Sequence, residues 1–278
     1  MTDLIQISSL EKVLPKSDYK AKPIEKITVL HGEEGAYQIA FKEKHKTEVN
    51  IKITGDIADF IKVYSVGCVP VMLPTYEEGF NDPDYISKEP GMYPDILMPV
   101  ENGKTEATGW YQSIWITVDR NAPVGKHNIT AELITAEHKK SCELIYEVLP
   151  IELPESDLIF TQWFHTDCIA EYYKVPVWSE KHWELIEKFI NTAVKNGVNM
   201  ILTPVFTPPL DTEVGGERPT VQLVGIKKEG EIYSFDFTLL ERWVDLCIRC
   251  GIKYFEISHL FTQWGAKFTP KIVATEEG

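Results

Sequence analysis

Polar side chains able to bind or activate a substrate follow two apolar segments in the second half of the chain. His165 and Asp167 lie at the end of the apolar run 158–165, and Glu256 and His259 lie in a later run. Alternate residues of a strand share one face, so a strand continuing through residue 167 would present His165 and Asp167 together. We expect this pair to line a pocket for a polar substrate; a purely structural pair is the alternative.

A metal centre is a second chemistry that the His-x-Asp pattern permits. The same pattern occurs at the end of the first strand in metal-dependent hydrolases with barrel folds. A zinc site needs at least three protein ligands. His259 is a possible third ligand, but no other residue completes the site. We therefore expect no metal and no other cofactor.

Five further positions are candidates for contacts with a substrate. Asn199 and Glu256 are expected to face inward from the second and third strands, and His259 to lie where the third strand meets its loop. Gln263 and Trp264 follow that strand, and an exposed indole is a common apolar platform for a sugar ring. Structural alternatives are a Glu256 that ties strand ends together through backbone amides and a Trp264 that covers an edge of the fold.

The elements that must position these residues alternate between strands and helices. Apolar runs predict strands at 158–165, 198–203 and 253–261, and amphipathic segments predict helices from Ser179 to about Asn196 and from Thr238 to the residue before Gly251. This order is typical of parallel βα units, whose functional groups gather at the carboxyl ends of the strands.

Local signals support both helices. Ser179 is a suitable N-cap, and Trp178 and Trp183 have the spacing of a hydrophobic staple around it. Thr238 and Glu241 have the spacing of a capping box for the second helix.

An insertion of about thirty residues separates the second strand from its helix. Residues 206–220 predict a long loop, which we expect to form a wall or lid of the site, with a packing loop as the alternative. The segments Thr220–Ile226 and Glu231–Phe235 predict a hairpin around 228–230.

The first half of the chain, residues 1–153, predicts an antiparallel β-sandwich of about seven to nine strands. Apolar and polar residues alternate from Ile24 to about Pro150, with turn residues between the runs. The segment Tyr76–Asp95, rich in Pro, Gly and Asp, predicts a long excursion from the sandwich. The domain with the parallel βα units then covers residues 154–278.

Composition narrows the partners. The 278 residues contain 28 Lys and Arg and 42 Asp and Glu, a net charge of −14 that opposes binding to nucleic acid. No apolar run approaches the ~18 residues of a membrane span, and Met1–Gln6 lacks the basic and apolar regions of a signal peptide. The chain has five cysteines, a small and odd number that does not suit a disulfide scaffold, and Cys247 and Cys250 lie within a predicted helix. We expect a cytoplasmic protein with no membrane partner.

Several motifs resemble glycoside hydrolase family 123 and its uncharacterised relatives: Phe164–Cys168, Thr203–Val224 and Ile257–Ala266, with Glu89–Asp95 and Ala122–Gly125 similar to that family's N-terminal domain. The resemblance implies a β-sandwich followed by a (β/α)₈ barrel that removes terminal N-acetylgalactosamine, or a related N-acetylhexosamine, from glycans. It also implies substrate assistance with retention of configuration. The 2-acetamido oxygen attacks the anomeric carbon, an Asp orients it, and the adjacent Glu is the acid and base.

The sequence departs from that pattern at the catalytic residues. No Asp-Glu dipeptide occurs in the 278 residues. The part from residue 154 has about half of the ~250 residues of a barrel. We therefore expect the first part of a barrel, with the remaining strands and the catalytic pair beyond Gly278 and a chain that is inactive alone. Its open edge would favour self-association. The alternative is a non-catalytic carbohydrate-binding or structural module.

Overall fold

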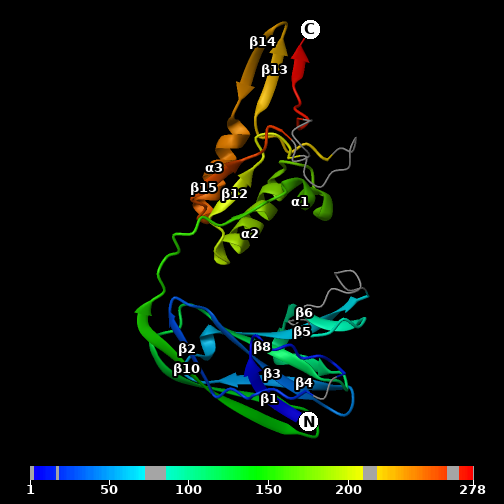
Figure 1. Ribbon diagram of the computed structural model, residues 1–278, viewed down its shortest axis with the longest axis vertical. Coiled ribbons are helices and arrows are strands. Elements are labelled where there is room, and N and C mark those ends of the chain that lie inside the picture. Colours follow the sequence, from blue (N-terminus) through cyan, green and yellow to red (C-terminus); the bar gives the residue numbers. More distant parts are fainter. Residues whose placement is uncertain (1–2, 17–18, 73–85, 209–217, 262–268, 278) are drawn as a thin grey trace. The chain divides into compact units, whose positions relative to one another are not determined.

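The computed structural model describes residues 3–16, 19–72, 86–208, 218–261 and 269–277 (Figure 1). The chain divides into two compact units, Met1–Glu155 and Ser156–Gly278. The sequence pattern places the boundary two residues earlier, after Leu153.

Unit 1 contains two five-stranded sheets. The first sheet has the order β1 (Asp3–Ser8), β3 (Gly35–Lys42), β8 (Gln112–Val118), β5 (Ile61–Val71) and β6 (Gly91–Pro99). The second has the order β2 (Lys26–His31), β10 (Lys139–Glu152), β9 (Gly125–Ile134), β4 (Thr47–Thr54) and β7 (Lys104–Ala107). Two short 3₁₀ helices, η1 (Ala58–Phe60) and η2 (Glu101–Gly103), lie in connections. All strand pairs are antiparallel except β2 with β10.

The two sheets share one apolar core. Alternate residues of the inner strands enter it, including Tyr37 and Ile39 of β3, Ile114 of β8, Leu133 of β9 and Tyr146 of β10, all fully buried. Burial of one face of each sheet explains the alternation in the sequence and gives the architecture of a β-sandwich.

This sandwich has more strands than the sequence predicts, because β1 and short strands such as β7 escape the alternation. In β1 the pattern is obscured by Gln6, a buried polar residue. Its amide Nε2 donates to the carbonyl oxygens of Ile24, at 2.8 Å, and Glu143, at 3.0 Å. A buried amide is tolerated inside a strand when it has hydrogen-bond partners. From the sequence alone, however, a glutamine indicates a position that faces solvent.

The predicted excursion Tyr76–Asp95 is wrong at its end. Residues 73–85 lie outside the described part of the chain, but Gly91–Asp95 belongs to β6, which pairs with β5. Pro94 and Pro99 suggest a loop from sequence. Both lie on the edge strand of the sheet, where a missing backbone donor is tolerated.

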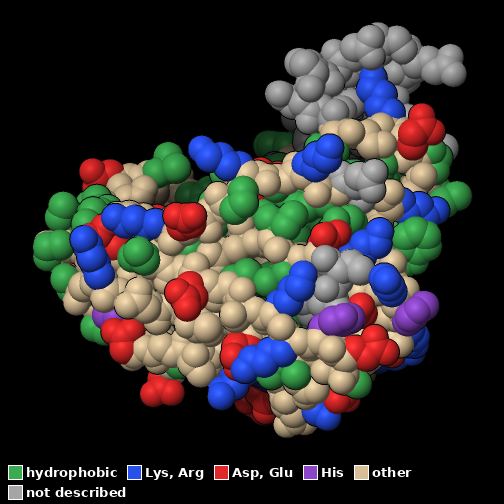
Figure 2. Space-filling model, turned by 90° about the horizontal axis from the view of Figure 1, so that it is seen from below, with side chains coloured by type: hydrophobic (Ala, Val, Ile, Leu, Met, Phe, Trp, Pro, Cys, Tyr) green, Lys and Arg blue, Asp and Glu red, His purple; other side chains and the backbone are tan. Residues whose placement is uncertain are grey.

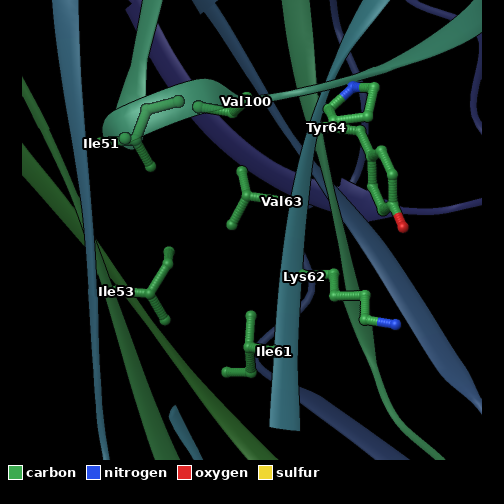
Figure 3. Close-up of a pocket in the computed structure, with 9 residues that line it drawn as sticks. Ile51, Ile53, Ile61, Lys62, Val63, Tyr64 and Val100 are labelled. Carbon is green, nitrogen blue, oxygen red and sulfur yellow. The ribbon is translucent and has the colours of Figure 1, made fainter. Parts of the chain in front are cut away.

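A cavity of about 440 Å³ lies between the two sheets at one edge of the sandwich. Figure 3 shows Ile51 and Ile53 of β4 facing Ile61 and Val63 of β5 across it. Lys62 of β5 points to the opposite side of its strand, as the period of two requires.

Charges of both signs are mixed on the surface, and Figure 2 shows this mixture on one face. Lys139 Nζ lies 2.6 Å from Glu132, and Lys104 Nζ lies 2.9 Å from Glu48. Exposed pairs of this kind each contribute at most about 1 kcal/mol to stability.

Unit 2 combines two small sheets with three helices. Its elements are β11 (Thr161–Gln162), α1 (Thr166–Tyr173), α2 (Glu180–Lys195), β12 (Met200–Thr203), β13 (Gly225–Glu229), β14 (Ile232–Asp236), α3 (Thr238–Cys250), β15 (Tyr254–Ile257) and β16 (Thr275–Glu277). Strands β11, β12 and β15 are parallel, and β14, β13 and β16 form a second sheet. The predicted βα order is confirmed, and a hairpin is present, although its first strand is Gly225–Glu229 and not Thr220–Ile226. Three parallel strands among the described residues do not confirm a (β/α)₈ barrel.

Helix α2 begins as its sequence predicts. Ser179 Oγ accepts a hydrogen bond from the backbone of His182 at 3.3 Å, and the rings of Trp178 and Trp183 stack at 4.9 Å. Gly197, with φ of +92°, follows the helix, and this left-handed conformation favours glycine.

Helix α3 begins differently from the prediction. Its N-cap is Phe237, and the carboxylate of Asp236 accepts from the backbone N and the hydroxyl of Thr238, at 2.9 and 2.6 Å. Asp236 therefore takes the capping role that the sequence gives to Thr238, and the predicted capping box with Glu241 is wrong.

The first predicted strand of this unit, 158–165, is much shorter in the structure. Only Thr161–Gln162 pairs with β12, and α1 begins at Thr166. Helix α1 was not predicted, because eight residues are too few for a clear period.

The five cysteines are free. Cys247 is buried on α3 beneath α2 and β12, and burial raises the pKa of its thiol. Within the described ranges, each helix is too short or too polar to span a bilayer.

One buried histidine of unit 1 links two loops. His127 Nδ1 lies 2.6 Å from Asp56 Oδ2, and its Nε2 lies 2.8 Å from the carbonyl oxygen of Pro123. Both partners are acceptors, so both ring nitrogens donate only when the ring is protonated. Burial opposes the charged ring, but the bonds to Asp56 and Pro123 outweigh it and raise the pKa of His127.

We expect His127 to make unit 1 more stable in acid than in base. Its raised folded-state pKa means that its stabilisation is complete below the usual value near 6.5 and is lost as pH rises through the folded-state pKa. His127→Gln should lower the free energy of unfolding at pH 6 by about 1–3 kcal/mol and flatten this pH dependence, measured by urea unfolding. His45→Gln, at an exposed position, is the control. An unchanged pH profile in His127→Gln would contradict the assignment.

Candidate functional site

The carboxyl ends of β11, β12 and β15 meet at one edge of the parallel sheet. Side chains at or just past these ends can therefore converge on one substrate. The structure places Trp163 after β11, Thr203 at the end of β12 and Glu256 in β15 at this edge.

Glu256 joins two strand ends through its side chain. Oε2 accepts from the hydroxyl of Thr161 at 3.2 Å, and Oε1 accepts from the indole N–H of Trp163 at 3.3 Å. These two bonds bring Thr161, Trp163 and Glu256 together on one face of the sheet, in agreement with the inward orientation expected for Glu256. Glu256 ties strand ends, as the structural alternative proposed, but its partners are side chains.

An aromatic pair lies beside this carboxylate. The ring of His259 contacts the edge of Trp163 at a centroid distance of 5.3 Å, with an interplanar angle of 77°. Trp163 is 47% exposed and His259 is half-buried. An exposed indole, an imidazole and a carboxylate within one cluster can stack on a ring and accept or donate hydrogen bonds to its hydroxyl or amide groups. We call Thr161, Trp163, Glu256 and His259 the edge cluster.

His165 and Asp167 do not share a strand face, so that argument for them was wrong. His165 is the N-cap residue of α1, and Asp167 lies in the first turn, 1% exposed. Asp167 Oδ2 accepts from Nε of Arg218 at 2.6 Å, which turns this carboxylate toward the protein. In this structure Asp167 anchors other elements and does not line an open pocket.

Arg218 is a site residue that the sequence reasoning did not single out. It comes from the end of the long loop, and its side chain is 14% exposed. Besides Asp167, it contacts Cys168, with Nη2 at 3.1 Å from Sγ. A lone arginine in a Gly- and Pro-containing loop gave no periodic signal, and its partner lies about fifty positions earlier.

Residues of the long loop are held near both ends. The hydroxyl of Thr207 accepts from the backbone N of Val221 at 2.9 Å, and the backbone N of Leu223 donates to the carbonyl of Pro204 at 3.0 Å. Residues 209–217, in the middle of the predicted wall or lid, lie outside the described part of the chain.

Asn199 is not brought together with the edge cluster. It precedes β12, at the amino end of the sheet, and its side chain bonds the backbone N of Phe160 at 2.8 Å and the carbonyl of Leu158 at 2.9 Å. These two bonds explain why a polar residue stands at this position without a substrate role. Gln263 and Trp264 lie outside the described residues.

His182 connects the starts of α1 and α2. It is fully buried, its Nδ1 accepts from the backbone N of Trp178 at 3.0 Å, and its Nε2 donates to the carbonyl of Thr166 at 2.9 Å. Burial lowers the pKa of this ring, which suits a neutral imidazole with one donor and one acceptor.

No group of three or more His, Cys, Asp and Glu residues in the described part of the chain is placed to hold a metal ion. At the His-x-Asp pair, the guanidinium of Arg218 already neutralises Asp167. This pairing does not suit a second cation at the same carboxylate.

A groove of about 590 Å³ lies on the opposite side of β11 from the edge cluster. Its largest side chains are Phe160, Phe164, Tyr173 and Phe189, from the segment around β11 and from α1 and α2.

Part of the chain matches the model of a known protein family. Residues 163–278 match the model of the glycoside hydrolase 123 catalytic domain. The resemblance to glycoside hydrolase family 123 is confirmed over this segment. No curated protein matches the sequence significantly.

One solved structure shares the fold over nearly the whole chain. A family 123 glycoside hydrolase from Clostridium perfringens, studied for glycolipid glycan hydrolysis, superposes with a TM-score of 0.70 at 16% identity. The alignment covers 97% of this chain and 52% of that one, so this chain spans about half the length of that protein. A PapD-like domain of human CEP192 matches at 12% identity and a TM-score of 0.24, covering 52% of this chain and 98% of the domain.

We expect Arg218→Gln to destabilise unit 2 by about 3–5 kcal/mol, because the buried carboxylate of Asp167 loses its counter-charge. Urea unfolding followed by tryptophan fluorescence measures this change. Lys181→Gln, which removes an exposed pair with Glu184, should change stability by less than about 1 kcal/mol.

The double variant Asp167→Asn/Arg218→Gln should recover part of the loss, because no charge is then left buried. If Arg218→Gln were as mild as Lys181→Gln, the buried pair would not anchor the loop.

Proposed function

We propose that the chain is part of a glycoside hydrolase whose unit 2 binds a terminal N-acetylgalactosamine or a related N-acetylhexosamine. One observation carries this proposal: the segment matched by the family 123 catalytic domain, 163–278, contains Trp163, Glu256 and His259 of the edge cluster. The relative from Clostridium perfringens acts on glycolipid glycans.

Three members of the edge cluster contact the sugar in this proposal. The exposed ring of Trp163 stacks on the apolar C–H face of the sugar, and its N–H is already bound to Glu256, so the ring is held before the sugar arrives. The carboxylate of Glu256 keeps capacity to accept from a sugar hydroxyl, since each oxygen has a second lone pair. His259 supplies a further polar contact beside the indole.

The proposed reaction is substrate-assisted, an exception to the usual two-carboxylate scheme. The 2-acetamido oxygen forms a bond to the anomeric carbon while the glycosidic C–O bond breaks, and a carboxylic acid protonates the leaving oxygen. Water, deprotonated by the resulting carboxylate, then opens the cyclic intermediate with net retention. An adjacent Asp orients the acetamide. This Asp-Glu pair does not occur in the sequence, so we propose that the 278 residues supply sugar contacts and that further polypeptide supplies the pair.

The same proposal includes the fold. We infer that unit 2 is the first part of a (β/α)₈ barrel, in which the groove beside Phe160 and Phe189 receives another helix and β15 another strand. Two facts support this: the chain covers about half of the relative, and both outer strands of the described parallel sheet have one unpaired edge. Self-association through these surfaces is the corresponding expectation for the chain alone.

A non-catalytic carbohydrate-binding role is the second candidate. The observation that favours it is the absence of an Asp-Glu dipeptide from the sequence. It predicts sugar binding without turnover even in a longer polypeptide.

We expect a polypeptide extended to a complete barrel to hydrolyse an aryl N-acetyl-β-galactosaminide, and the 278-residue chain to bind the sugar without cleaving it. Trp163→Ala should lower kcat/KM of the extended protein by at least about tenfold, or about 1.4 kcal/mol, because the sugar platform is lost. Trp110→Ala, at a comparably exposed position of unit 1, is the control. The rate at which the aryl group is released measures the activity of the extended protein, of the 278-residue chain and of both variants.

Equal turnover by the 278-residue chain would contradict the proposal that further polypeptide supplies the catalytic pair. It would require that one of the 278 residues protonates the leaving group. Full activity of a folded Trp163→Ala variant would contradict the sugar platform.

A further inference from the structure

The outer face of the first sheet in unit 1 carries a row of ring side chains. Trp115 of β8 pairs directly with Tyr64 of β5, and Tyr64 pairs directly with Pro99 of β6. Directly paired residues share a face, and neighbouring strands lie about 4.8 Å apart. The indole, phenol and pyrrolidine rings therefore follow one another across the sheet. We call these three residues the ring row.

The ring row faces away from the sandwich core. Ile114 and Ile116, on either side of Trp115, are fully buried in the core, so Trp115 has the opposite orientation. Figure 3 shows Tyr64 leaving β5 on the side opposite to Ile61 and Val63, which line the cavity between the sheets.

Trp115 is held along its strand. Its indole N–H donates to the hydroxyl of Thr117 at 3.1 Å, two residues further on the same face. The indole thus runs over Thr117, which is only 9% exposed. A ring fixed in this way keeps apolar surface available at little cost in side-chain freedom when a ligand binds.

The two ends of the ring row have different surroundings. On the β3 side, Gln38 pairs with Trp115, and its amide donates to the carbonyl oxygens of Ser8, Ser9 and Glu11 at 3.4, 3.3 and 2.9 Å. The segment beyond β1 therefore crosses the sheet next to the indole. On the other side the row ends at the exposed edge strand β6. Lys62, exposed and next to Tyr64 on this face, offers an ammonium donor.

We propose that the ring row is an oligosaccharide-binding subsite, distinct from the edge cluster of unit 2. One pyranose stacks on Trp115 and the next on Tyr64 and Pro99, while Lys62 donates to a hydroxyl or to the carboxylate of an acidic sugar. A narrow line of ring faces with a polar donor at its side suits a chain of sugar rings, which combine C–H faces with hydroxyl edges. The choice of a glycan as ligand rests on the proposed function, but the subsite needs no catalytic residue.

The test is calorimetric titration of the 278-residue chain with tetrasaccharides that end in N-acetylgalactosamine, in galactose or in a uronic acid. Trp115→Leu keeps apolar cover and removes the ring, whereas Trp115→Phe keeps a ring; both lose the bond to Thr117. We expect Trp115→Leu to weaken binding about tenfold and Trp115→Phe to retain most of it. Trp110→Leu, an exposed tryptophan outside the row, should bind as the parent does. Tyr64→Ala is a second variant if Trp115→Leu melts early.

Two single-site variants separate this proposal from the proposed function. A two-site parent that loses one site in Trp115→Leu and the other in Trp163→Ala supports both. Loss confined to Trp163→Ala overturns the ring row alone, and loss confined to Trp115→Leu overturns the edge cluster alone. Absence of saturable binding by every tetrasaccharide, or a change of oligomeric state in Trp115→Leu without sugar binding, overturns the subsite and assigns the row to a protein contact.

Discussion

The buried ion pair between Asp167 and Arg218 is the constraint on which the functional edge of unit 2 depends. Burial of a carboxylate costs several kcal/mol, and the guanidinium at 2.6 Å offsets that cost only while the long loop keeps its end beside α1. The same contact fixes the first turn of α1, whose backbone at Thr166 is also held by His182. One charge pair thus connects a loop, a helix start and the segment that carries Trp163.

Each of the two units has its own apolar core. Unit 1 closes its core between two sheets, and residues such as Tyr37 and Leu133 lose all contact with solvent. Unit 2 has a compact core around Trp243 and Ile186, but it leaves Phe189, Ile248 and Ile257 on its surface, 42%, 57% and 58% exposed. Apolar exposure beside a groove is typical of a surface that packs against another element. These exposed side chains, of which Phe189 lines the groove, support the inferred barrel.

The start of α2 was readable from sequence, and the contact between Asp167 and Arg218 was not. The cap and staple of α2 depend on Ser179, Trp178 and Trp183 within one turn, and all three act as predicted. The role of Asp167 depends on Arg218, which no spacing rule connects to it. The inward orientation of Glu256 followed from the alternation of residues along a strand. Asn199 met the same rule, but its hydrogen bonds to Leu158 and Phe160, in the segment before β11, give it a structural role.

On both surfaces proposed to contact sugars, a hydrogen bond from the indole N–H holds the tryptophan ring in place. Trp163, just after β11, donates its indole N–H to Glu256 of β15, two strands away, and Trp115 donates to Thr117 of its own strand. Trp243 also donates to a threonine, Thr203, but it is fully buried and has no ring face to offer. Anchoring by the indole N–H therefore fixes a ring without defining its role. Exposure of the anchored ring separates a platform from a core residue, because a ligand can gain apolar contact only from surface that folding left accessible.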